Sequence, residues 1–294
     1  MSYRRLPLIA AAIVIAGACT GQPGSSPGTS ASPDPSGQPS AEPVGAIDHP
    51  TGATDIVLRM EEGGGFVPVE FVLTQTPQFT LYGDGTIIFQ APPSEAPPPA
   101  GGNGVVRQEP LRVGRLTEAE IQALLEFAIA DGGLGLASKD LYDNPMVADA
   151  PTTTFTIHAG GLDKTFGVVA LGIDSPDVPN KALRAQFLEL AERLRPDEGD
   201  PVGEAFIPER YRGILVEGRG GGADWPWPDI GIDEFTMPGD EEGPAFPSRV
   251  MTPAEIEATG VTEPYGGFQN LLIEAPDGTA YAFVARPLLP DETR

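Results

Sequence analysis

The sequence predicts an α+β fold, with helices packed on one face of an antiparallel sheet and a smaller β-rich C-terminal unit. Three observations support this class. Short runs rich in β-branched and aromatic residues are separated by glycine turns, as in β-hairpins. Two longer runs carry apolar residues at the spacing of one helix face. The short connections leave no room for the long crossovers of parallel strands, so the strands are expected to pair antiparallel.

The chain of 294 residues divides into four predicted parts. They are an export signal at 1–18, a disordered tether at 19–47, an α+β domain at 48–198 and a β-rich C-terminal subdomain at 199–294. The break before the last part lies in 195–204, where Pro, Gly, Asp and Glu replace the apolar pattern, as in a linker between structural units.

The N-terminus has the order of an export signal. Arg4 and Arg5 precede an apolar run at 6–16, which is shorter than the roughly 20 residues of a membrane-spanning helix. Small residues follow, and the only cysteine of the chain, Cys19, comes directly after them. Residues 16–19, Ala-Gly-Ala-Cys, resemble the lipobox of bacterial lipoprotein precursors. The resemblance implies a diacylglycerol on the Cys19 thiol, cleavage before this residue and acylation of the new amine.

The segment after the cysteine is expected to be a flexible tether. Residues 20–44 are almost entirely Gly, Ser, Thr, Pro, Ala and Gln, with Asp34 and Glu42 as the only charges. Such a segment cannot bury enough apolar area to offset the entropy of ordering it. Two acyl chains anchor a protein durably. The predicted location is therefore the extracytoplasmic face of the cell membrane, with the membrane contacted through a lipid anchor at Cys19.

The charge of the chain argues against several partners. The sequence has 18 basic and 42 acidic residues. Removal of 1–18 takes away Arg4 and Arg5 and no acid, which leaves 16 basic residues against 42 acidic ones and a formal charge of −26. An anionic surface repels nucleic acid. The sequence has neither a P-loop nor a dinucleotide-binding glycine pattern, so we also expect no nucleotide ligand.

The first half of the folded part is predicted as strands. Segments 55–62 and 66–73 are expected to pair around a turn of three glycines. Segment 78–90 is expected to form a hairpin that turns at 83–85. The Pro/Gly-rich stretch 91–104 follows and is expected to be a surface loop.

Two helices and another hairpin complete the predicted α+β domain. The first helix begins at Thr117, which has the spacing of a capping box with Glu120. Its expected apolar stripe is Ile121, Leu124, Leu125 and Ala128. Strands are expected at 152–159 and 163–171, and the second helix at 180–195. The expected buried face of the second helix is Leu183, Phe187, Leu190 and Leu194.

The C-terminal subdomain is predicted to contain a strand at 210–218, a short capped helix within 251–260 and a hairpin at 269–288. The heptapeptides 117–123 and 252–258 match at five of seven positions. This match fits a degenerate internal repeat, and it fits two independent capping boxes equally well.

Three segments together resemble a known class of proteins. They are LYGDGTIIF at 81–89, LTEAEIQALLEFA at 116–128 and ADAPTTTFTIHAGG at 148–161. The succession is similar to a class of uncharacterised bacterial lipoproteins, whose domain has a hairpin, an LTxxE helix and a second hairpin. The resemblance covers roughly 55–195. It implies location and fold only, because no catalytic residues come with the class.

The sequence has few residues for catalysis or metal binding. Of the two histidines, His49 is expected to be exposed at the edge of the tether, and His158 to lie in a strand on the face opposite Ile157 with nothing to orient it. No nucleophile elbow is present. The acids within 60–65 and 238–243 could hold calcium weakly, but solvated turns explain them better. We expect no cofactor and no bound metal.

One segment is a candidate site, because it holds both tryptophans of the chain among acidic residues and prolines. Its candidate ligand-binding residues are Asp224, Trp225, Trp227, Asp229, Asp233 and Glu234. The indoles could form a platform for a sugar ring, with the acids gripping hydroxyls or acting as an acid/base pair. The other interpretation packs the indoles over the C-terminal hairpin, and we favour it because tryptophan is usually largely buried.

These observations predict a membrane-anchored extracytoplasmic lipoprotein with a binding or structural role in the envelope, rather than an enzyme. Its partner would be an envelope glycan or protein. The alternative is an extracytoplasmic glycan hydrolase that uses carboxylates beside Trp225 and Trp227.

Overall fold

The computed structural model describes most of the chain after the predicted tether. The described residues are 45–91, 104–173, 175–196, 203–218, 222–237 and 246–292. The predicted export signal at 1–18, Cys19 and the tether up to residue 44 lie outside them. Most of the loop expected at 91–104 and the acidic turn at 238–243 also lie outside them. These features stay predictions.

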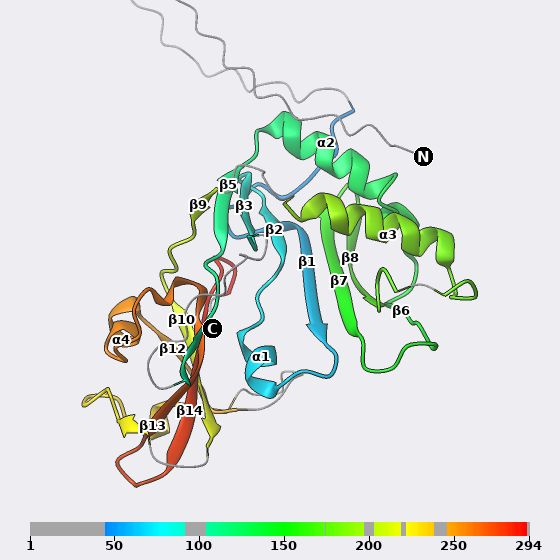
Figure 1. The fold of residues 1–294 in the computed structure, drawn as a ribbon. Coiled ribbons are helices and arrows are strands. Elements are labelled where there is room, and N and C mark those ends of the chain that lie inside the picture. The colour runs from blue at the N-terminus through cyan, green and yellow to red at the C-terminus, as the bar shows by residue number, and fades with distance from the viewer. Residues whose placement is uncertain are drawn as a thin grey trace, which may run out of the picture. The chain divides into compact units, whose positions relative to one another are not determined.

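The first of two sheets contains eight strands in the order β6-β8-β7-β1-β2-β3-β5-β9 (Figure 1). All neighbours pair antiparallel except β6 and β8, which are parallel. The strands are β1 (Ile56–Gly64), β2 (Phe79–Tyr82), β3 (Thr86–Phe89), β5 (Arg112–Arg115), β6 (Leu141–Tyr142), β7 (Pro151–Ala159), β8 (Leu162–Val169) and β9 (Glu204–Ala205).

The second sheet has the order β11-β13-β14-β10-β12, and β4 pairs with Phe268 and Gln269 at the start of β13. Its strands pair antiparallel apart from β11 and β13. They are β4 (Val106–Arg107), β10 (Tyr211–Glu217), β11 (Ala223–Asp224), β12 (Ser248–Met251), β13 (Phe268–Glu274) and β14 (Ala280–Pro287). The predicted hairpins at 78–90, 152–171 and 269–288 are all confirmed.

Four α-helices accompany the sheets in the described residues. They are α1 (Val69–Thr74), α2 (Glu118–Ile129), α3 (Lys181–Leu194) and α4 (Pro253–Glu257). Both predicted capping boxes are confirmed, because the hydroxyls of Thr117 and Thr252 accept hydrogen bonds from the backbone N–H groups of Glu120 and Glu255. Two sheets and few helices make a mixed fold that is mostly β, so the predicted α+β class holds in its coarse form only.

The predicted strand at 66–73 is wrong, because this segment contains the helix α1. The alternation of Val69, Phe71 and Leu73 suggested a strand with one buried face. In the structure Val69 and Leu73 are four residues apart on one side of a helix and contact the apolar cluster of the second sheet, whereas Phe71 is 44% exposed. Tertiary contacts have therefore overridden the local pattern.

The main core lies between the first sheet and the helices α2 and α3, which lie along the same face (Figure 1). The buried helix residues are Ile121, Leu125, Ala128, Phe187, Leu190, Ala191 and Leu194. Ile47, the last residue of the predicted tether, contacts this core, and its backbone forms two hydrogen bonds with the Gln122 side chain. The folded part therefore includes Ile47.

Arg184 of α3 is fully buried beside this core. Its guanidinium donates to the carbonyl oxygens of Tyr142 at 3.1 Å, Val169 at 2.8 Å and Ala170 at 3.0 Å. These carbonyls belong to β6 and to the end of β8, so one side chain ties the edge of the first sheet to the helix. The apolar periodicity of α3 gave no sign of this role.

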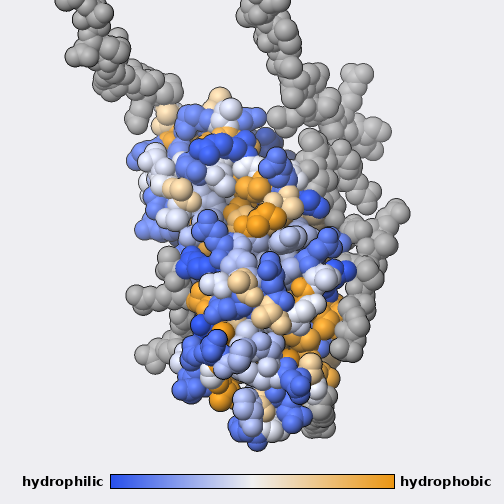
Figure 2. Space-filling view, turned by 90° about the vertical axis from the view of Figure 1, so that its left-hand side faces the viewer, coloured by the Kyte–Doolittle hydropathy of each residue, from blue (hydrophilic) through white to orange (hydrophobic). Residues whose placement is uncertain are grey.

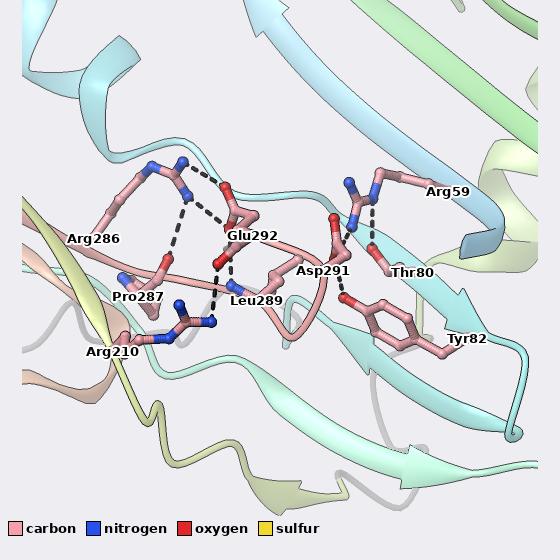
Figure 3. A network of polar contacts seen from close by, with 9 residues as sticks. All are labelled: Arg59, Thr80, Tyr82, Arg210, Arg286, Pro287, Leu289, Asp291 and Glu292. Carbon is pink, nitrogen blue, oxygen red and sulfur yellow. Dashed lines mark hydrogen bonds and ion pairs between the residues drawn. The ribbon is translucent and has the colours of Figure 1, made fainter. Parts of the chain in front are cut away.

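A polar network joins the C-terminal residues to the first sheet (Figure 3). The Asp291 carboxylate accepts hydrogen bonds from Arg59 of β1 at 2.6 Å and from the hydroxyl of Tyr82 in β2. Arg59 also donates to the Thr80 hydroxyl at 3.1 Å. The side chains of Arg59 and Asp291 are only 11% and 15% exposed, so this is a largely buried ion pair.

Glu292 belongs to the same network and fixes the turn after β14 (Figure 3). Its carboxylate binds the guanidinium of Arg286 and accepts from the backbone N–H of Leu289 at 2.8 Å. Arg210 donates to the Glu292 carbonyl oxygen at 3.1 Å.

Two short strands also connect the sheets. The strand β4 pairs in the second sheet, although the next strand in sequence, β5, belongs to the first. The strand β9 pairs in the first sheet, although the next strand, β10, belongs to the second. The predicted boundary between 198 and 199 stays a prediction.

We expect Arg184→Ala to lower the free energy of unfolding by about 3 kcal/mol or more, because it leaves buried carbonyls without a donor and opens a cavity. Urea denaturation measures this loss. Lys181→Ala, at an exposed position of the same helix, is the matched control and should change stability by less than about 0.5 kcal/mol. A loss below about 1 kcal/mol for Arg184→Ala would contradict the assigned role.

Glu61 of β1 makes stability depend on pH. Burial raises the pKa of Glu61 above its usual range, the nearby Arg59 opposes the shift, and the carboxylates of Glu292 and Asp291 add to it. The folded state therefore binds the proton more tightly than the unfolded state. The stability from this group is fully present below the ordinary glutamate pKa and is lost as the pH rises through the folded-state pKa.

Glu61→Gln removes the ionised form that burial disfavours, so it should raise the free energy of unfolding at pH 7. The difference from the wild type should shrink towards pH 4, where the Glu61 carboxyl is mostly protonated in both states. Guanidinium denaturation at pH 4, 5.5 and 7 checks both statements, with Glu126→Gln at an exposed position of α2 as the control. A Glu61→Gln protein that is less stable than the wild type at pH 7 would refute the prediction.

Candidate functional site

The predicted tryptophan segment forms part of the second core. Trp227 is 3% exposed, and its ring lies 4.9 Å from that of Phe283 in β14, centroid to centroid. Its indole N–H donates to the carbonyl oxygen of Glu255 at 2.6 Å, which ties the segment to α4. Trp227 therefore has the geometry of a core residue, with its single polar atom already bonded.

Trp225 is half-buried against Trp227, with the two rings nearly perpendicular and their centroids 5.0 Å apart. Its indole N–H donates to the carbonyl oxygen of Ile230 at 2.8 Å. Both indole donors thus bond to backbone carbonyls and not to solvent. Any stacking platform would consist of the exposed part of the Trp225 ring alone.

The four acids of this segment are all exposed. Asp224 lies in β11, Asp229 follows Trp227, and Asp233 and Glu234 lie in the short helix η3 (Ile232–Glu234). The Glu234 carboxylate accepts from the N–H of Gly231 at 3.1 Å and lies 3.3 Å from the Arg249 guanidinium. Glu234 thus has structural partners at both carboxylate oxygens, and none of the four acids lines the cavity beside α1.

Both histidines have partners, which corrects two expectations. The His49 side chain is 6% exposed, not free at the tether edge, and its ring nitrogens contact the Pro50 carbonyl oxygen at 2.7 Å and the Glu118 carboxylate at 3.3 Å. His158 is oriented by Asp163, whose carboxylate lies 2.8 Å from Nδ1 across the β7–β8 hairpin. The expected strand position of His158 is correct.

A cavity of about 230 Å³ lies beside the C-terminal end of α1. Chain segments far apart in sequence build it: the end of α1, the residues after β3, those after β4 and the turn before β13. Its polar lining consists of Thr74, Gln75, Thr76, Gln90, Gln108 and Glu109. Phe71 and Leu111 supply apolar surface.

Hydrogen bonds hold the frame of this cavity. The Gln269 amide of β13 donates to the hydroxyl of buried Thr74, and that hydroxyl donates to the Glu70 carbonyl oxygen at 3.1 Å. The Gln90 amide donates to the Thr76 carbonyl oxygen at 2.8 Å. The frame therefore links α1 to both sheets.

Three polar side chains of the lining have no partner in the described part of the chain. The amides of Gln75 and Gln108 and the carboxylate of Glu109 form no hydrogen bond or ion pair there. Within the described part of the chain, no protein group competes with a ligand for these side chains. Sequence reasoning missed them, because the residues are scattered along the chain and no short motif contains them.

The described residues contain no group of three His, Cys, Asp or Glu side chains that could hold a metal ion. Nor does any helix in that part of the chain have the length and apolar character needed to span a bilayer. On the face shown in Figure 2, hydrophobic residues lie in small patches separated by hydrophilic ones.

No protein-family model matches the sequence, and neither a curated protein nor a solved structure is significantly similar to it. The function must therefore be inferred from the residues and geometry of this chain itself.

Trp227→Ala should lower the free energy of unfolding by about 3–5 kcal/mol, the usual cost of deleting a buried aromatic ring. Trp225→Ala should cost clearly less, because that ring is half-exposed and fills less of the core. Urea denaturation of the two variants side by side measures the difference. Equal and small losses would favour the platform interpretation over packing.

Proposed function

We propose that the protein is a lipid-anchored extracytoplasmic lipoprotein, held at the membrane through Cys19. The observation that carries this proposal is the succession of an apolar run, Ala-Gly-Ala-Cys at 16–19 and a Pro/Ser/Gly-rich segment before the folded part. The first residues described as folded, including Ile47 and His49, follow this segment directly. The order of parts thus suits a globular domain on a flexible tether.

We further propose that the folded part is a non-catalytic binding module for an envelope component. The support is the cavity beside α1, where the side chains of Gln75, Gln108 and Glu109 have no hydrogen-bond partner among the described residues. The exposed acids of the tryptophan segment do not gather at this cavity, and Glu234 is held by Arg249. These observations favour binding over carboxylate-dependent hydrolysis, which needs two converging carboxyl groups.

Cys19→Ser should release the protein from the membrane fraction, because the thiol that would carry the lipid is absent. Mass spectrometry of the wild-type membrane extract should find an N-terminal peptide that begins at residue 19 and carries acyl chains. Ser25→Ala, in the same segment, is the control and should leave the protein in the membrane fraction. Wild-type protein with residues 1–18 intact and an unmodified thiol would overturn the proposal.

A further inference from the structure

We infer that the cavity beside α1 binds one ring of a neutral, hydroxyl-rich sugar. This inference deepens the proposed binding function and rests on it. Three properties of the cavity point to this ligand class: the hydrogen-bonding character of its free side chains, an exposed aromatic ring next to them, and its charge.

The free polar groups match the hydroxyl groups of a sugar. Each amide of Gln75 and Gln108 offers two N–H donors and one carbonyl acceptor, and the Glu109 carboxylate offers two acceptor oxygens. A sugar hydroxyl both donates and accepts hydrogen bonds. Two neighbouring hydroxyls on a ring can therefore bond to one amide, one to its N–H group and the other to its carbonyl oxygen. The Gln90 amide donates to Thr76 and keeps its carbonyl oxygen as a further acceptor.

The apolar lining suits the C–H face of a sugar ring. Phe71 is 44% exposed and lines the cavity, so its ring can contact a ligand without unfolding α1. Leu111, which is buried, adds further apolar surface to the lining. The volume of about 230 Å³ is below the roughly 300–1,000 Å³ of pockets for drug-sized ligands. The cavity therefore suits a single ring, with the rest of the glycan outside.

The charge of the cavity disfavours strongly anionic sugars. Among the described lining residues Glu109 is the only ionisable one, and the chain as a whole has a formal charge of −24. An anionic ring would be repelled. One exposed carboxylate holds a cation only weakly, because solvent and salt screen it. A neutral ring that bonds to Glu109 through its hydroxyls avoids both difficulties.

A peptide fits the cavity less well than a sugar. Peptide-binding sites usually offer an unpaired strand edge or a groove of apolar side chains. Six of the ten described lining residues are polar. The donors of Gln75 and Gln108 are side-chain amides and not the backbone of a strand edge. Peptide binding is therefore treated as an outcome that contradicts the inference.

The test uses residues 19–294 with Cys19→Ser, which keeps every described residue. This protein is applied to an array of neutral glucose, mannose, galactose and N-acetylglucosamine oligomers, with glucuronic acid and glucosamine oligomers alongside. We expect binding to at least one neutral oligomer. Calorimetric titration of that oligomer should then show affinity about 3- to 10-fold weaker for Gln108→Ala, the effect of losing one or two hydrogen bonds.

Matched variants separate the cavity from general effects. Phe71→Ala should also weaken binding, whereas Phe66→Ala, which removes a 92% exposed ring outside the cavity lining, should not. Gln186→Ala, on α3, is the control for Gln108→Ala. Unchanged melting temperatures for all four variants exclude loss of folding as the cause.

The possible results distinguish the sugar inference from the proposed function. Binding to isolated cell envelopes without binding to any neutral oligomer overturns the inference and leaves the binding module standing. Failure to bind either overturns both. Binding only to glucosamine or glucuronic acid oligomers, competition by an envelope peptide, or equal affinities for Gln108→Ala and Gln186→Ala also overturns the inference.

Discussion

The buried ion pair between Arg59 and Asp291 sets how the end of the chain meets the first sheet. Separating such a pair leaves a buried charge without a partner, which is strongly destabilising. The pair therefore favours the one placement of the C-terminal segment in which Asp291 contacts Arg59. The Thr80 hydroxyl accepts a further hydrogen bond from Arg59, and the Tyr82 hydroxyl donates one to Asp291. Burial, followed by the hydrogen bond to Asp291, raises the pKa of Tyr82, so its hydroxyl remains a donor across the physiological pH range.

The cavity is built separately from this network, because none of the network residues lines it. Its residues come from α1, from the segments after β3 and after β4, and from the turn before β13, so it forms only when parts of both sheets come together. The bond from Gln269 to Thr74 adds a direct link between β13 and α1. A frame held by hydrogen bonds suits ligand binding, because its side chains lose little conformational entropy when a ligand binds.

Local patterns predicted the hairpins and capped helices, because their turns, caps and apolar faces are encoded within about 15 residues. The helix α1 was missed because contacts with the second sheet, not its own alternation, decide its form. The strands β4, β6, β9 and β11 have two residues each and depend on distant partners. Of the predicted site, the packing of Trp227 followed from its chemistry, whereas the cavity could not, since its parts meet only in the folded chain.

Asp291 lies 232 residues after Arg59, and this separation has a consequence for how the protein is made. Ribosomes add about 5–20 residues per second, so Arg59 waits about 10–50 seconds for its partner. During that interval the Arg59 guanidinium of β1 lacks its ion-pair partner Asp291. The buried residues that face the helices, up to Leu194, all precede Asp291 in sequence, so that side of the sheet can assemble before the ion pair forms.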